Sequence, residues 1–128
     1  MLLPAIGVLS LAVLLGLWLA AGYLVYDTPP RHMGIVAIIH GTVGATCVTL
    51  LYMALQGPGR DGLHSAGNFG WTGFVVLAAA LLGGLTILSL HLLRQRVNPI
   101  LVAAHASVAI AGAVIVLAYW SNHASFGR

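Results

Sequence analysis

The chain has 128 residues, of which 60% are hydrophobic and 5% are charged, and its formal net charge is +3. Soluble domains carry roughly a quarter charged residues, whereas this chain has five Arg, two Asp and neither Lys nor Glu to cover a water-facing surface. The Arg residues are scattered and form no basic patch, which excludes nucleic acid as an expected partner. Composition therefore predicts an integral membrane protein whose main partner is lipid.

Four apolar stretches without a charged residue run approximately over residues 3–26, 34–55, 69–93 and 99–120. Each is long enough for a spanning helix, which needs about 20 apolar residues, and none shows the strict alternation of a membrane β-barrel. No Lys or Arg precedes the first stretch, so we expect a retained helix rather than a secretory signal.

The connections between these stretches predict the topology. Residues 27–33 and 94–98 form short connections, and a Gly-rich one covers residues 56–68. Short connections make consecutive helices antiparallel neighbours, so we expect an all-α, up-and-down four-helix bundle in a single membrane domain, residues 1–128.

The distribution of Arg residues predicts the orientation. Arg31, Arg94 and Arg96 fall on one side of the membrane, and Arg60 and Arg128 fall on the other. Cytoplasmic loops carry the excess of basic residues, so this bias places both termini outside the cytoplasm. We expect a multi-pass protein of the bacterial inner membrane.

A faint internal repeat relates the second and fourth stretches. A shift of 65 residues lays 31–44 over 96–109. The matched positions include Arg31 with Arg96, His40 with His105, Gly41 with Ala106, Thr42 with Ser107 and Gly44 with Ala109. This match favours a duplicated two-helix hairpin.

The two histidines of the repeat are predicted to lie at one depth. His40 and His105 each lie six residues inside their stretch, or about 9 Å from the Arg-rich interface. Their helices would be diagonal in the bundle, with axes roughly 12–14 Å apart, so we expect no direct contact between the rings. A flat macrocycle fits such a gap, with iron bound by both histidines as in a b-type haem.

Other residues supply room and charge for such a cofactor. Small residues one turn from each histidine would admit a porphyrin, and Gly83 and Gly84 on the third helix would give similar room. Basic groups at the nearer interface would bind the haem carboxylates. The expected cofactor-binding residues, besides the ligands His40 and His105, are Gly41, Gly44, Ala106, Ala109, Arg31, Arg94, Arg96 and His91.

The helix count and the His40/His105 pair resemble the four-helix membrane cytochromes b and the cytochrome b subunits of respiratory enzymes. Those proteins often bind a second haem through further histidines on the same helices, where this chain has Ala54 and Tyr119, so one haem at most is expected. The chain also resembles small uncharacterised four-helix bacterial membrane proteins with histidines in the second and fourth helices, which implies no function.

We therefore expect an electron-carrying haem subunit of a larger membrane redox complex, with quinone as a candidate partner. The alternative is a cofactor-free accessory or assembly subunit of a respiratory or photosynthetic complex, because small residues also let membrane helices pack closely. A chlorophyll-type pigment, which needs one axial imidazole, is a third interpretation. No span contains a carboxylate and no catalytic motif is present, so we do not expect an enzyme.

Overall fold

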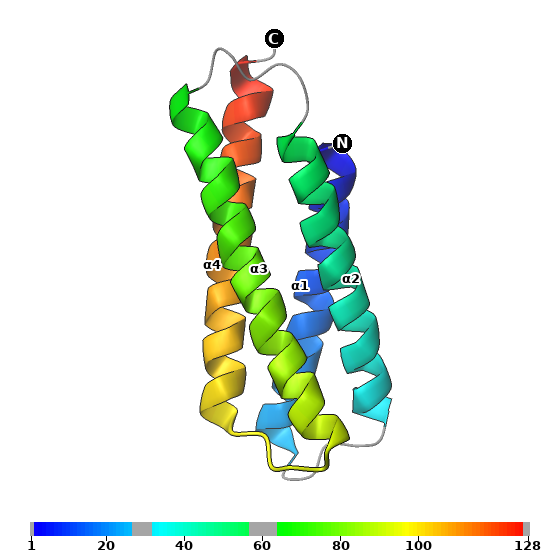
Figure 1. Ribbon diagram of the computed structural model, residues 1–128. Coiled ribbons are helices and arrows are strands. Elements are labelled where there is room, and N and C mark those ends of the chain that lie inside the picture. Colours follow the sequence, from blue (N-terminus) through cyan, green and yellow to red (C-terminus); the bar gives the residue numbers. More distant parts are fainter. Residues whose placement is uncertain (1, 27–31, 57–63, 127–128) are drawn as a thin grey trace.

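The computed structural model describes residues 2–26, 32–56 and 64–126 of the chain. These segments form four helices and no strand: α1 (Leu2–Val25), α2 (His32–Leu55), α3 (His64–Leu92) and α4 (Pro99–Phe126). The helices alternate in direction along one bundle (Figure 1). The predicted all-α four-helix bundle is confirmed. Helices satisfy every backbone hydrogen bond internally, as a chain in lipid requires.

Two helices extend past the apolar stretches that predicted them. α3 begins at His64 rather than near Phe69, so part of the expected 56–68 connection is helical. α4 continues to Phe126 rather than ending near Trp120. Hydropathy marks the length that can lie in lipid, whereas the helical hydrogen-bond ladder continues into polar residues beyond it.

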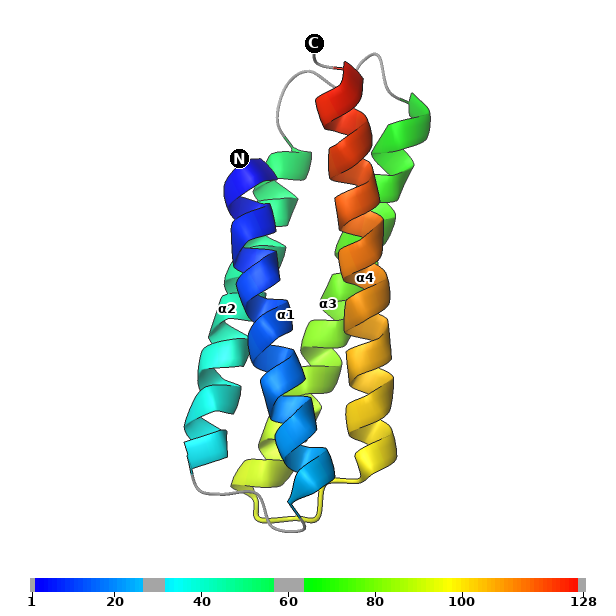
Figure 2. The same cartoon turned by 180° about the vertical axis from the view of Figure 1, so that it is seen from behind.

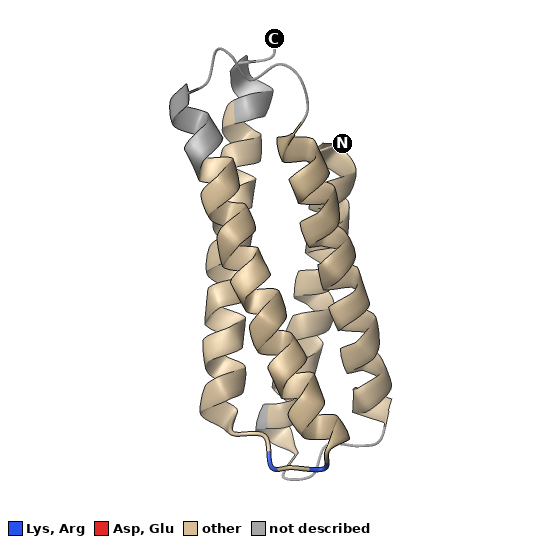
Figure 3. Cartoon of the chain, viewed as in Figure 1, with Lys and Arg blue, Asp and Glu red and all other residues tan. Residues whose placement is uncertain are grey.

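Each helix is long and apolar enough to cross a membrane, over Leu2–Tyr23, His32–Leu55, Phe69–Leu92 and Pro99–Asn122. Large apolar side chains cover the outside of the bundle, and Leu14, Leu82 and Ile100 are more than half exposed. Of the charged residues, only Arg94 and Arg96 lie in the described segments, and both are exposed in the α3–α4 connection (Figure 3). This surface is suited to lipid.

Hydroxyl side chains on the helices are satisfied within their own helix. Each donates a hydrogen bond of 2.8–3.0 Å to the carbonyl four residues earlier, which removes the cost of placing a hydroxyl in lipid. The residues are Ser10, Thr42, Thr46, Thr49, Thr86, Ser89 and Ser107.

The helices pack as two hairpins, α1–α2 and α3–α4, which are in more extensive contact internally than with each other. α2 also packs on α3, and α1 packs on α4 (Figure 2). Among the described residues the diagonal pairs α1/α3 and α2/α4 make no close backbone approach. The structure therefore places α2 and α4 diagonally and parallel, as expected.

The tightest apolar packing occupies the half of the bundle nearest the start of α1. Leu51 and Leu55 are completely buried there, and the Cys47 thiol is buried 3.7 Å from the carbonyl oxygen of Ala5. This cluster holds all four helices together at one end. Its buried members are Leu9, Cys47, Leu51, Leu55, Leu77, Ala113 and Val116.

A short connection joins α3 to α4 at the opposite end. The amides of Arg94 and Gln95 donate to the carbonyls of His91 and Leu90, at 3.1 and 2.9 Å, which is the Schellman pattern of helix termination. The pattern needs one residue in the left-handed backbone conformation, and Arg94 adopts this conformation with φ of 55°. This turn reverses the chain within a few residues.

We predict that Arg94→Gly stabilises the protein by up to about 1 kcal/mol, because glycine adopts a positive φ without the steric cost of a Cβ atom. Thermal unfolding in detergent measures the effect. Arg96→Gly removes a charge from the same connection without relieving a positive φ, and it should not stabilise. Equal midpoints for the two variants would contradict the prediction.

Candidate functional site

An apolar cavity of about 550 Å³ lies between the four helices, and all four contribute to its walls. The volume is within the range of ligand pockets, about 300–1,000 Å³. Along α1 the lining residues run from Leu9 to Tyr23, a distance of about 20 Å along the bundle. The cavity is therefore large enough and long enough for a cofactor.

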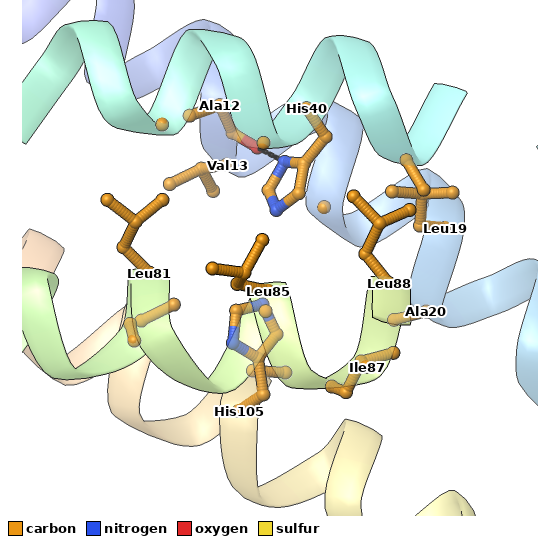
Figure 4. Close-up of a pocket in the computed structure, with 18 of the residues that line it drawn as sticks. Ala12, Val13, Leu19, Ala20, His40, Leu81, Leu85, Ile87, Leu88 and His105 are labelled. Atoms are coloured by element: carbon orange, nitrogen blue, oxygen red, sulfur yellow. Dashed lines mark hydrogen bonds between the residues drawn. The ribbon is translucent and has the colours of Figure 1, made fainter. Parts of the chain in front are cut away.

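His40 on α2 and His105 on α4 extend into this cavity from opposite sides (Figure 4). Their ring centroids are 6.2 Å apart and their planes are nearly perpendicular, at 87°. The expectation that the rings would not touch was wrong. It considered only the separation of the helix axes, whereas both side chains reach inward and close the diagonal gap.

α1 fixes the orientation of His40. The Nδ1 atom donates a hydrogen bond of 3.0 Å to the carbonyl oxygen of Ala12. Since a carbonyl only accepts, Nδ1 carries the proton and Nε2 keeps its lone pair. One turn further along α1, a Cβ atom added at Gly16 would lie 3.0 Å from His40 Cε1. A larger residue at this position would push the ring away from α1, so glycine allows the close approach.

α3 provides a similar but incomplete seat for His105, where a seat is a backbone carbonyl followed one turn later by a glycine that packs against the ring. A Cβ atom at Gly84 would lie 3.0 Å from His105 Cε1, and one at Gly83 would lie 3.6 Å from Nδ1. The Ala80 carbonyl faces this ring, yet among the described residues no hydrogen bond of acceptable geometry satisfies the buried Nδ1 atom. An unsatisfied buried polar atom costs about 1–3 kcal/mol, so the His105 ring is held less favourably than the His40 ring.

The two seats are related by the same repeat as the two histidines. Ala80 and Gly84 on α3 each follow Ala12 and Gly16 on α1 by 68 positions, whereas His105 follows His40 by 65. The two connections are equally long, and the offsets differ because Gly84 and His105 lie nearer the α3–α4 connection than Gly16 and His40 lie to the α1–α2 connection. Sequence analysis missed Ala12 and Gly16, and the Ala-x-x-x-Gly spacing at this second offset is the signal that could have found them.

The small residues predicted beside the histidines all line the cavity, but they do not seat the rings. A Cβ atom at Gly41 would meet no atom within 4 Å, and one at Gly44 would make only an ordinary contact of 3.8 Å with Leu81. These positions contribute open space. The lining residues of this set are Gly41, Gly44, Ala106 and Ala109.

The predicted partners of the haem carboxylates lie elsewhere. Arg94 and Arg96 are exposed in the α3–α4 connection and do not line the cavity, and Arg31 lies outside the described residues. His91 does not line the cavity either, because its Nδ1 atom shares a hydrogen bond of 3.0 Å with the hydroxyl of Tyr23. Tyr23, which sequence analysis did not select as a site residue, does line it.

The ligand set limits the metal chemistry of the cavity. Within the described segments no group of three or more His, Cys, Asp or Glu side chains lies close enough to hold a metal ion. His40 and His105 can supply two ligands, so any further ligands of a metal held between them would come from a cofactor, water or another small molecule.

In comparisons with known proteins, no protein-family model matches the chain, and no curated protein or solved structure matches it significantly.

We predict that Gly84→Ala displaces the His105 ring, whereas Gly83→Ala does not. The two glycines are neighbours on α3, but only a Cβ atom at Gly84 would lie within 3.0 Å of the ring. Elsewhere a Gly→Ala change in a helix stabilises by about 0.4–1 kcal/mol. Thermal unfolding in detergent should show this gain for Gly83→Ala and none, or a loss, for Gly84→Ala. A similar gain for both would refute the proposed seat.

Proposed function

We propose that the chain is a small membrane b-type cytochrome that holds one haem b between His40 and His105 and carries single electrons within a larger membrane redox complex. The observation that carries the proposal is the meeting of two imidazoles from diagonal helices across an apolar cavity. Intramembrane ionisable residues are costly and are functional candidates by default.

The distance between the rings suits a shared metal. The centroids are 6.2 Å apart, so a metal midway would lie about 3 Å from each. A ring nitrogen directed at that point would be about 1 Å nearer, which leaves about 2 Å, the length of an imidazole–metal bond. Nearly perpendicular rings are compatible with this arrangement because each imidazole can rotate about its own bond to the metal.

The chain's own groups would tune and protect the centre. Haem supplies a reversible one-electron change at its iron. The hydrogen bond from His40 to Ala12 fixes the tautomer with Nε2 free and raises the basicity of this ligand. The apolar walls exclude water, and burial is one of the factors that set the potential of a haem.

The surroundings of the site favour an electron carrier over an enzyme. The described residues are almost entirely within the four helices, so redox partners must reach the haem inside or beside the membrane. Other membrane subunits and quinone are the proposed partners. We place the protein in the bacterial inner membrane with both termini outside the cytoplasm, which puts Arg94 and Arg96 on the cytoplasmic side.

Two alternative functions, a pigment-binding subunit and a cofactor-free accessory subunit, fit different parts of the same geometry. A pair of chlorophyll-type pigments, each bound by one histidine, would need two macrocycles between rings that are 6.2 Å apart, so the separation favours one shared macrocycle. A cofactor-free accessory subunit is favoured by the hydrogen bond that already satisfies His40 Nδ1. That alternative leaves the apolar cavity between the helices without a purpose.

We predict that His40→Ala and His105→Ala each weaken haem binding by more than 10- to 100-fold, the cost typical of losing an outer-shell partner of a metal ligand. The haem-to-protein ratio and the spectrum of each purified variant measure the loss. His32→Ala, at the exposed first residue of α2, is the control and should retain haem. The His40→Ala and His105→Ala proteins should still insert in the membrane.

Loss of haem from only one of the two variants would eliminate the bis-histidine arrangement. Full retention by both would leave the accessory subunit as the better account.

A further inference from the structure

A second polar pair crosses the bundle between the other two diagonal helices. The hydroxyl of Tyr23 on α1 and Nδ1 of His91 on α3 are 3.0 Å apart, and the two rings meet edge to face with centroids 6.2 Å apart. Tyr23 is half-buried and lines the cavity, whereas His91 lies behind it. The pair therefore places polar groups beside a mostly apolar cavity wall.

This pair lies at a defined place relative to the histidine ligands. Tyr23 is seven residues beyond Gly16 on α1, and His91 is seven residues beyond Gly84 on α3. Because α1 and α3 are parallel, the pair is about 10 Å from the layer of the ring seats, toward the end that carries Arg94. A macrocycle held at its centre by the histidines would direct one edge to this level.

The hydrogen bond between Tyr23 and His91 has two possible arrangements. If the phenol donates to Nδ1, the tyrosine oxygen has no proton left for the cavity. If His91 Nδ1 carries the proton and donates to the phenolic oxygen, the hydroxyl proton is free to be donated to a ligand. A ligand that only accepts hydrogen bonds selects the second arrangement, and an ionised carboxylate is such a group.

His91 is held in place for this role. A Cβ atom added at Gly34 would lie 3.2 Å from His91 Nε2, so the ring packs against the first turn of α2. On the other side its Nδ1 atom faces the phenol. The ring therefore supports Tyr23 rather than entering the cavity itself.

We infer that Tyr23, oriented by His91, binds a carboxylate side chain of the macrocycle and so directs the carboxylate edge of the haem toward the Arg-rich end of the bundle. This inference rests on the proposed haem site between His40 and His105. A charge-assisted hydrogen bond from a phenol inside an apolar cavity is stronger than one between neutral groups. Tyr23 thus takes the part that sequence analysis assigned to Arg31, Arg94, Arg96 and His91.

The test compares haem with its dimethyl ester, which has the same macrocycle and iron but no ionised carboxylate. Purified full-length apoprotein in detergent is titrated with each compound, and binding is followed by absorption. Tyr23→Phe, which removes only the hydroxyl, should weaken haem binding about 10-fold and leave binding of the ester unchanged. His91→Leu should likewise lower the ratio of the affinity for haem to the affinity for the ester.

Tyr26→Phe is the matched control, because Tyr26 is near the same end of α1 but is exposed and does not line the cavity. It should bind both compounds as the unmodified chain does. Equal weakening of haem and ester by Tyr23→Phe would overturn the carboxylate subsite and leave the haem site intact. If the unmodified chain binds neither compound, the proposed function fails as well.

Discussion

An imidazole in the interior of a bilayer must find its partners within the protein, because no water is present to supply them. The arrangement of this bundle follows from where two such rings can be placed. Ser and Thr hydroxyls on the same helices donate hydrogen bonds to carbonyls of their own helix. The histidine rings extend away from their own helices and need partners on a neighbouring helix. His40 donates to a carbonyl of α1, whereas Nδ1 of His105 makes no hydrogen bond of good geometry within the part of the chain that the structure describes.

Close packing within each hairpin is what brings the rings to the centre. Gly16 on α1 and Gly84 on α3 leave room for the imidazole of the following helix, so each ring lies along its own hairpin and extends toward the other. The two hairpins pack less extensively on each other than internally. The cavity occupies the space between them, and the apolar cluster around Leu51 adjoins it on the side nearest the start of α1, with Leu9, Cys47 and Leu77 common to both.

Sequence periodicity and composition were sufficient for the helices but not for the contacts between side chains. Long uncharged stretches can only be helices in lipid, and short connections leave few topologies, so the bundle and the diagonal placement of His40 and His105 could be predicted. The contact of the rings could not, because distances between helix axes omit how far a side chain reaches.

The residues that sequence analysis missed have a common character. Ala12 acts through its backbone carbonyl and Gly16 through the absence of a side chain, so neither residue type indicates chemistry. Tyr23 was missed for another reason, because its partner His91, which was selected, is far away in the sequence and meets it only when α1 and α3 are aligned. The equivalence of the two hairpins is clearest where it positions the rings, at the identical pairs Ala12 and Ala80, Gly16 and Gly84, and His40 and His105.

The most direct measurement is the visible absorption spectrum of the protein purified in mild detergent with its native partners, recorded oxidised and then after reduction with dithionite. Coordination by both His40 and His105 predicts a low-spin, six-coordinate b-type spectrum whose α-band sharpens on reduction. A spectrum without features in the visible region would contradict a haem between the two histidines and with it the proposed electron-carrying role.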